Sequence, residues 1–250
     1  MSNRIISWFS HGAASAVSTK LAIAEGEPVI VANCWIAEEH PDNRRFHRDS
    51  EKWFAQPILS LINGMFGGSI YEVFKRDRFL VGPKGARCTG RLKKDVRKSF
   101  QRPGDRIIMG YCADEQDRID RFIDSNPDVD VWPILAEKGL THADCLAMVE
   151  RAGLELPAMY QMGYRNNNCI GCVKGGMGYW NKIRRDFPDT FERMAAMERY
   201  LGRTILSRRR GDQRERIPLT ELKEGEGRYE DEPDIECGIA CEWAEREYAA

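Results

Sequence analysis

The chain has 250 residues, 42% of them hydrophobic, and a formal net charge of −1. This length fits one large domain or one domain with an appendage, and the charge excludes a global attraction to nucleic acid or to an anionic membrane. No run approaches the roughly eighteen apolar residues of a transmembrane helix. Polar residues also interrupt the apolar N-terminal stretch before it can form a signal-peptide core, so we expect a cytoplasmic protein.

The first segment of the chain predicts a strand, a turn and a helix. Ile5 to Phe9 is a short apolar run that suits a buried parallel strand, and residues 16–22 indicate a helix. The small and polar residues between them, Ser10 to Ser15, would direct backbone N–H groups and the positive helix end at an anion such as phosphate. An ordinary turn explains the same pattern, since no Walker or GxGxxG motif is present here.

Strands and helices then alternate. We expect strands at 28–35, 57–62, 106–111 and 129–134, helices at 44–54, 90–100, 113–125 and about 142–152, and a less regular segment at 69–80. Asp42 or Asn43 is expected to cap the second helix, and Thr141 with Asp144 resembles a capping box. This alternation predicts an α/β fold, a doubly wound, mainly parallel and Rossmann-like sheet, over residues 1–156.

Residues 157–250 are expected to form a helical, cysteine-bearing extension that packs on this domain. Tyr179 to Leu201 is amphipathic, and Pro188 should divide it, with Asp186 or Asp189 capping the second piece. The basic run 203–216 indicates a solvated face that pairs with the acidic tail, or a surface for a polynucleotide backbone. The acidic run 221–236 has too little apolar content to pack and is expected to be mobile.

The eight cysteines indicate metal binding or catalysis rather than disulfides, because the chain shows no secretion signal. Cys34 and Cys112 lie in or just after predicted strands, and Cys145 lies in a predicted helix. We expect these three to be buried small hydrophobic residues. The other five occur in glycine-rich or polar stretches, where burial is a weaker explanation: Cys88, Cys169, Cys172, Cys237 and Cys241.

Four segments match, in order, the motifs of one family. They are Ser10-His11-Gly12-Ala13-Ala14-Ser15, Cys88-Thr89-Gly90-Arg91-Leu92-Lys93, the Gly110–Arg118 segment, and Gly163-Tyr164 followed by Cys169-Ile170-Gly171-Cys172. Through them the chain resembles the adenine-nucleotide α-hydrolase-like (PP-loop) superfamily. Within it, the chain is most similar to the sulfonucleotide, or phosphoadenosine phosphosulfate (PAPS), reductase family, and to its uncharacterised branch in phages and bacteria.

The resemblance implies a [4Fe–4S] cluster on Cys88, Cys169 and Cys172, because iron–sulfur clusters take cysteine thiolates. Arg87 stands where family members often carry another cysteine. Cys241 or Cys237 would then supply the fourth ligand, or the fourth iron would stay open. Zinc is the alternative that thiolate chemistry allows.

The resemblance also implies a site for an adenine nucleotide, either PAPS, APS or ATP. Cys237 lies in a Glu-Cys-Gly motif and would be the nucleophile that attacks sulfur, unless it ligates the metal. Three positions depart from the family pattern: Ala14 replaces an aspartate, Cys112 an arginine and Ala240 a histidine. The nucleotide-binding residues implied are Ser10, His11, Gly12, Ala13, Ala14, Ser15, Lys93, Gly110, Glu115 and Arg118.

We therefore expect an oxidoreductase that acts on sulfur, resembles phosphoadenylyl-sulfate reductase and uses a thiol electron donor. A second hypothesis keeps the fold but makes the protein an ATP-dependent sulfurtransferase that thiolates tRNA or DNA. Ala14 counts against that reaction, because ATP-cleaving members carry an acid there. A third hypothesis is a non-catalytic accessory protein that binds a nucleotide or a cluster.

Overall fold

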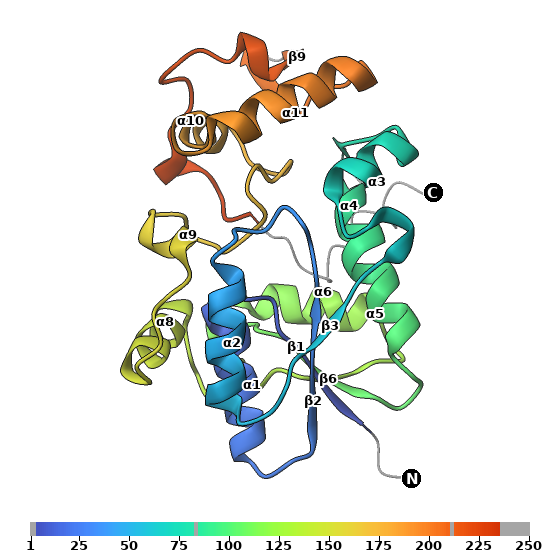
Figure 1. Ribbon diagram of the computed structural model, residues 1–250, viewed down its shortest axis with the longest axis vertical. Helices are drawn as coiled ribbons and strands as arrows, with labels where there is room; N and C mark the ends of the chain where they lie inside the picture. Colours follow the sequence, from blue (N-terminus) through green and yellow to red (C-terminus); the bar gives the residue numbers. More distant parts are fainter. Residues whose placement is uncertain (1–3, 83–84, 211–212, 236–250) are drawn as a thin grey trace.

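A parallel sheet forms the centre of the computed structural model, which describes residues 4–82, 85–210 and 213–235. In this part of the chain five strands pair in the order β3-β2-β1-β6-β7, all parallel (Figure 1). The order runs one way from β1 to β3 and the other way from β1 to β7, so the predicted doubly wound α/β fold is confirmed. Ligands bind such sheets at the carboxyl ends of the strands where this reversal occurs. The strands are β1 (Ile5–Trp8), β2 (Val29–Cys34), β3 (Leu59–Leu61), β6 (Arg106–Ile108) and β7 (Asp130–Trp132).

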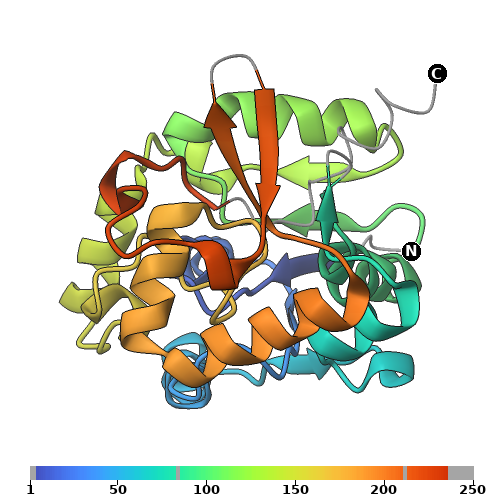
Figure 2. The same cartoon turned by 90° about the horizontal axis from the view of Figure 1, so that it is seen from above.

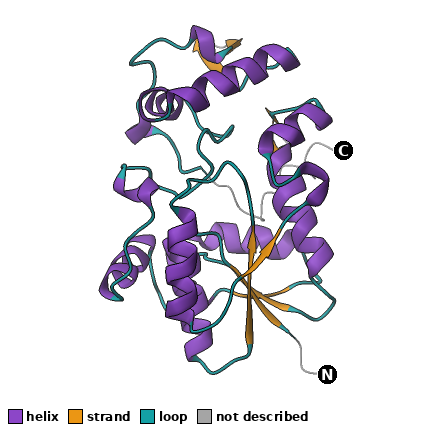
Figure 3. Ribbon diagram, viewed as in Figure 1, coloured by secondary structure: helices purple, strands orange, loops and turns teal. Residues whose placement is uncertain are grey.

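Helices cover both faces of the sheet (Figure 3). Ile5 of β1 packs with α1, α2 and α8, whereas Ile6 and Trp8 pack with α5 and α6 on the other face. This alternation follows from the period of two along a strand, and it explains why β1 is buried at all four residues. The helices of this domain are α1 (Ala13–Ala24), α2 (Asn43–Phe54), α3 (Ile70–Asp77), α4 (Arg87–Thr89), α5 (Asp95–Phe100), α6 (Gln116–Ser125), α7 (Ile134–Glu137) and α8 (His142–Arg151).

Short elements complete this domain. Residues 69–80 contain the regular helix α3, which corrects the expectation of a less regular segment, and β6 ends three residues earlier than expected. The expected helix 90–100 begins as a π-helix, in which the Asp95 N–H donates to the Gly90 carbonyl. The short elements are β4 (Val81–Gly82), β5 (Gly85–Ala86), the π-helix η2 (Gly90–Lys94) and the 3₁₀ turns η1 (Gly64–Phe66) and η3 (Ala113–Glu115).

The two predicted caps have different outcomes. The capping box of α8 is confirmed, because the Asp144 N–H donates to Thr141 Oγ1 at 3.2 Å and the Thr141 N–H to Asp144 Oδ2 at 2.9 Å. The side-chain cap of α2 is wrong. Asp42 stands at the right position, but its carboxylate instead binds Arg45, at 2.7 Å, and the Ala158 N–H, at 2.9 Å.

The C-terminal extension lies over the carboxyl end of the sheet (Figures 1 and 2). Its helices share one hydrophobic cluster with α3. Pro188 divides the expected long helix into two helices. Phe187 occupies the N-cap position of the second helix, so neither Asp186 nor Asp189 caps it. Asp186 instead accepts from Tyr164 Oη and Lys182 Nζ, both at 3.0 Å. The extension contains α9 (Ala158–Gln161), α10 (Met177–Asp186), α11 (Pro188–Leu201), the antiparallel β8 (Leu206–Arg210) and β9 (Gln213–Ile217), and the 3₁₀ turns η4 (Leu219–Glu221) and η5 (Tyr229–Asp231).

Residues 223–235, which we call the strap, belong to the acidic run that is expected to be mobile, and the structure gives them defined hydrogen-bond partners. Glu232 accepts three backbone N–H groups at the start of α10, from Gly176 at 3.2 Å, Gly178 at 2.6 Å and Tyr179 at 3.2 Å. Arg165 donates to the Tyr229 carbonyl at 3.0 Å and also to the Glu230 and Glu232 carbonyls. The low apolar content of this segment did not predict these contacts, because the strap is held by charged hydrogen bonds and not by apolar packing.

One salt bridge joins the basic and the acidic runs of the extension. Arg208 on β8 forms a salt bridge with Glu226 of the strap at 2.5 Å, as expected for a basic run that pairs with the acidic one. Within the described ranges no helix is both long and apolar enough to cross a bilayer.

Candidate functional site

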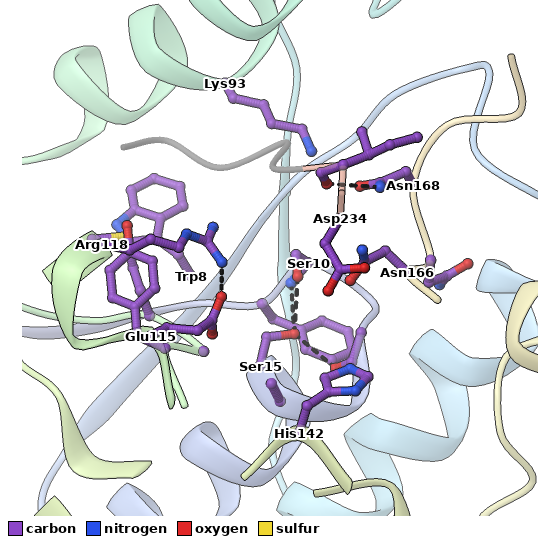
Figure 4. A pocket seen from close by; sticks show the side chains of 18 of the residues that line it. Trp8, Ser10, Ser15, Lys93, Glu115, Arg118, His142, Asn166, Asn168 and Asp234 are labelled. Carbon is purple, nitrogen blue, oxygen red and sulfur yellow. Dashed lines mark hydrogen bonds and ion pairs between the residues drawn. The ribbon is translucent and has the colours of Figure 1, made fainter. Parts of the chain in front are cut away.

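A pocket of about 230 Å³, which we call the main pocket, opens at the carboxyl ends of β1, β2 and β6. The turn that joins β1 to α1 forms its floor, Lys93 lies across the pocket from this turn, and Arg118 lies at one side, beside Glu115 (Figure 4). Asp234 and Ile235, at the end of the strap, close another side. The pocket therefore lies where the strand order reverses, which is where ligands bind in sheets of this kind.

Ser15 fixes the shape of the floor. Its Oγ accepts from the Ser10 backbone N–H at 3.0 Å and from Ser10 Oγ at 3.1 Å, and donates to the Gly12 carbonyl at 2.9 Å. Gly12 stands at the N-cap of α1, and the first turn of that helix contains no acid. The positive end of α1 therefore faces the main pocket with no acid in its own first turn, an arrangement that favours anions, although the Asp234 carboxylate lines the same pocket.

Gly110 allows this floor to pack against the end of β6. A Cβ atom at Gly110 would lie 2.6 Å from the Ser15 backbone nitrogen and 2.8 Å from the Ala14 carbonyl carbon. Side chains do not approach backbone atoms so closely, so only glycine fits at this position without a shift of the loop.

The structure brings together most of the residues that are predicted to bind a nucleotide. Glu115 and Arg118 form a salt bridge at the edge of the main pocket, and Glu115 also accepts the Cys112 N–H at 2.9 Å. Ala13 is buried, and its N–H donates to Tyr160 Oη at 3.4 Å, so it does not face the pocket. The predicted residues that line the main pocket are Ser10, Gly12, Ala14, Ser15, Lys93, Gly110, Glu115 and Arg118.

His11 points away from the main pocket. Its ring lies 3.0 Å from Glu39 Oε2 through Nδ1 and 3.0 Å from His47 Nδ1 through Nε2, and the residue is 4% exposed. Asn43 donates to the same Glu39 oxygen at 3.0 Å, and Asn167 donates to the His11 carbonyl at 2.8 Å. These five residues, which we call the His11 network, hold the turn from behind, so His11 is a satisfied turn residue and not a pocket contact.

The network shifts the titration of its members. Burial raises the pKa of the Glu39 carboxyl, but the hydrogen bond and charge of His11, helped by Lys93 and Asn43, outweigh burial and leave this pKa below its ordinary value. Burial and the neighbouring His11 lower the pKa of His47. Both groups therefore take up protons less readily in the folded chain than in the unfolded one.

The backbone of His11 has a φ of 60°, in the left-handed region that disfavours side chains. We expect His11→Ala to be less stable than His11→Gly by about 1 kcal/mol, because both lose the network and only glycine relaxes the backbone. Urea denaturation measures this difference. Ala55→Gly, at φ 57°, is the control that isolates the backbone contribution, and equal stability of the two His11 variants would contradict the prediction.

Acid is expected to destabilise the fold through His47. Because the pKa of His47 is lower in the folded chain, the unfolded chain binds a proton at higher pH than the folded chain does. The contribution of neutral His47 to the free energy of unfolding is therefore complete above pH ~6.5 and is lost as the pH falls below that value. The free energy of unfolding should therefore drop between about pH 7.5 and 5.5. His47→Gln should show a smaller drop, and a drop equal to that of the unchanged chain would refute the role of His47.

Three cysteines are buried, as expected. Cys34 is 7% exposed, and Cys112 and Cys145 are fully buried. Burial raises the pKa of the Cys34 thiol to about 12 although this residue lines the main pocket. The hydrogen bond to Cys145, with burial, raises the pKa of Cys112. Neither thiol is a nucleophile near neutral pH, because the reactive form is the thiolate.

The three expected metal ligands border one hydrophobic cluster. Cys169 and Cys172 are each 6% exposed within it, and Cys88 packs against it. Tyr179 Oη accepts the Cys172 N–H at 2.9 Å and donates to the Cys169 carbonyl at 3.3 Å, which fixes the loop between them. Cys88 lies in α4 and the other two lie in one loop, so the expected ligands border the same hydrophobic cluster from two separate segments.

The metal centre nevertheless stays a prediction. Among the described ranges no group of three or more His, Cys, Asp or Glu side chains is arranged to hold a metal ion. The other ligand candidates, Cys237 and Cys241, lie outside the described residues, and so does Cys237 as the expected nucleophile.

Sequence reasoning missed several residues of the main pocket. Asn33 is the second-to-last residue of β2 and donates to the Phe9 carbonyl at 2.8 Å. A polar residue near the end of a buried strand is the signal that would have found it. Asp234 and Ile235 gave no such signal, because only the strap brings them to the pocket.

The fold and site define an α/β protein with an anion-suited turn at the switch point of its sheet. No protein-family model matches the chain, and no curated protein matches its sequence.

Proposed function

We propose that the protein is an enzyme resembling the sulfonucleotide reductases, which binds an adenine nucleotide in the main pocket and reduces or transfers its sulfur with a thiol. The observation that supports this most is the meeting of the Ser10–Ser15 turn and the end of the strap at one pocket. One side suits the phosphate of a nucleotide, and the other belongs to the segment that continues into the Glu-Cys-Gly motif.

The length of chain between the strap and Cys237 supports a thiol acting in the main pocket. Ile235 lines the pocket, and Asn168 holds it there by donating to its carbonyl at 3.1 Å. Cys237 follows Ile235 by two residues, and two residues of extended chain span at most about 7 Å. A thiol at this position is therefore within reach of a ligand in the pocket.

In the proposed reaction the Cys237 thiolate attacks the sulfur of the bound sulfonucleotide. A sulfur–sulfur bond forms, the bond from sulfur to the phosphate oxygen breaks, and the nucleotide leaves with its phosphate. A thiol donor then attacks the cysteine sulfur, a disulfide forms, and sulfite leaves with the electron pair. The α1 end, Lys93 and Arg118 would hold the phosphate during the first step.

Cys88, Cys169 and Cys172 would hold the iron–sulfur cluster that the resemblance implies. The Ala14 position, which lacks the aspartate of ATP-cleaving relatives, favours binding a nucleotide over hydrolysing ATP.

Two measurements test the proposal. Anaerobically purified protein should contain iron and sulfide, and should release sulfite from APS or PAPS when a dithiol is supplied. Cys237→Ser should abolish sulfite release and leave nucleotide binding intact, whereas Cys145→Ala, in the core, should retain activity. A zinc-containing protein would contradict the cluster, and pyrophosphate release from ATP dependent on added tRNA or DNA would contradict the reductase reaction.

A further inference from the structure

A second cavity, of about 460 Å³, lies on the other side of the His11 network. It is formed by the loop that follows β2 and by one face of α2, and the proposed reaction does not use it. The side chains that matter here are Trp35, His40, Arg44, His47 and Arg48. Pockets of this volume accommodate ligands the size of a nucleotide.

Two cations face this cavity without a counter-ion. Arg44 and Arg48 lie one turn apart on α2 and are exposed, and neither forms an ion pair with another residue of the described chain. Arg45, between them, is bound by Asp42 at 2.7 Å and Asp49 at 3.3 Å. Within the described residues the cavity therefore carries positive charge that no ion pair compensates, on a helix whose one other arginine is paired.

The acids near the cavity do not cancel this charge. Glu39 is committed to His11 and Asn43 within the His11 network. Glu51 lies 3.8 Å from His47 Nε2. Burial lowers the pKa of both His40 and His47, so near neutral pH these rings add hydrogen-bonding nitrogen atoms rather than charge.

Trp35 adds a flat aromatic surface. A Cβ atom at Gly68 would lie 2.6 Å from the Trp35 ring, so the indole rests directly on the backbone there, which holds it in place. The residue remains partly exposed and lines the cavity. Arginines beside a fixed aromatic ring are the combination that binds a phosphate and stacks a nucleobase.

We propose that the second cavity binds one nucleotide unit, with its phosphate on Arg44 and Arg48 and its base against Trp35. The unit is either part of a single-stranded nucleic acid or a free nucleotide, since both present the same phosphate and base. This site is distinct from the main pocket, because the His11 network separates the two. The proposal does not depend on the proposed reaction.

Binding of a fluorescently labelled single strand of about ten nucleotides, measured by anisotropy, and of AMP, measured by calorimetry, tests the proposal. Arg44→Gln with Arg48→Gln should weaken binding by about ten-fold or more and reduce the magnitude of the salt slope by about 1.4, the value for two phosphate contacts on a single strand. Trp35→Leu should weaken binding by a similar factor. Arg199→Gln with Arg203→Gln removes the same charge at the same spacing from exposed positions elsewhere and should change binding less than two-fold.

The outcomes show whether the bound unit belongs to a single-stranded nucleic acid or is a free nucleotide. Strand binding much tighter than AMP binding, and lost in the Arg44 and Arg48 variant, identifies a nucleic acid. Loss of one AMP site per chain in that variant, whether or not a second site remains in the main pocket, identifies a free nucleotide. Equal losses in the two arginine variants, or no binding of either probe, would overturn the proposal. Circular dichroism and urea denaturation of each variant show whether a loss comes from unfolding.

Discussion

Gly110→Ala is expected to destabilise the protein by about 3 kcal/mol and to abolish nucleotide binding. The added Cβ would lie 2.6 Å from the Ser15 nitrogen and 2.9 Å from its Cα. These are backbone atoms at the start of α1 and cannot rotate away as a side chain can. The turn must shift, and with it the N–H groups that would hold the phosphate. Urea denaturation and calorimetry with the nucleotide measure the two effects.

Gly64→Ala is the matched control, because a Cβ at Gly64 meets no heavy atom within 4 Å. It makes the same chemical change in open space and should alter the free energy of unfolding by less than about 1 kcal/mol. If Gly110→Ala behaves like this control, the packing of β6 against the turn does not determine the shape of the site.

Arg165→Ala is expected to detach the strap. Its guanidinium donates to the carbonyls of Tyr229, Glu230 and Glu232 and to Asp234 Oδ1, the last at 3.3 Å. Charge-assisted bonds of this kind contribute about 2 kcal/mol where they are partly exposed. Hydrogen exchange of residues 229–235 should rise strongly. Sulfite release should fall more than nucleotide affinity, because the strap leads to Cys237 and the phosphate turn does not depend on it.

Arg228→Ala removes the same side chain from the strap itself. Arg228 pairs with Asp231 at 3.5 Å, but the two side chains are 77% and 65% exposed, so the pair contributes about 0–1 kcal/mol. Exchange in the strap should hardly change. Unaltered exchange in Arg165→Ala as well would show that Glu232, bound to the start of α10, holds the strap alone.

The sheet could be predicted from sequence because each buried strand is a short apolar run bounded by turn residues. The ends of the elements were less predictable. Asp42 has the residue type of a cap, yet Arg45 and the Ala158 N–H compete for its carboxylate. Composition could not reveal that the strap is ordered, since Glu232 finds its partners some fifty residues away along the chain.

The site was predictable where function depends on the local chain. The turn from Ser10 to Ser15 is one segment, and eight of the ten expected nucleotide contacts line the main pocket. His11 could not be placed, because its direction depends on a left-handed φ and on Glu39 and His47, which other segments supply. The second cavity also escaped prediction, since Trp35 and Arg48 belong to different elements.

The π-helix η2 between Cys88 and α5 gives this part of the chain an unusual tolerance of a change in length. A π-helix holds one residue more than an α-helix over the same turn. Deleting one residue from Gly90–Lys94 would let the turn revert to α-helix with nearly the same rotation, so Cys88 would keep its direction relative to α5. Deleting one residue from α5 itself, a regular α-helix, would instead rotate the chain before it by about 100° and turn Cys88 away from the hydrophobic cluster that it borders with Cys169 and Cys172. Natural variants of this protein should therefore tolerate the loss of one residue in η2 far better than the loss of one residue in α5.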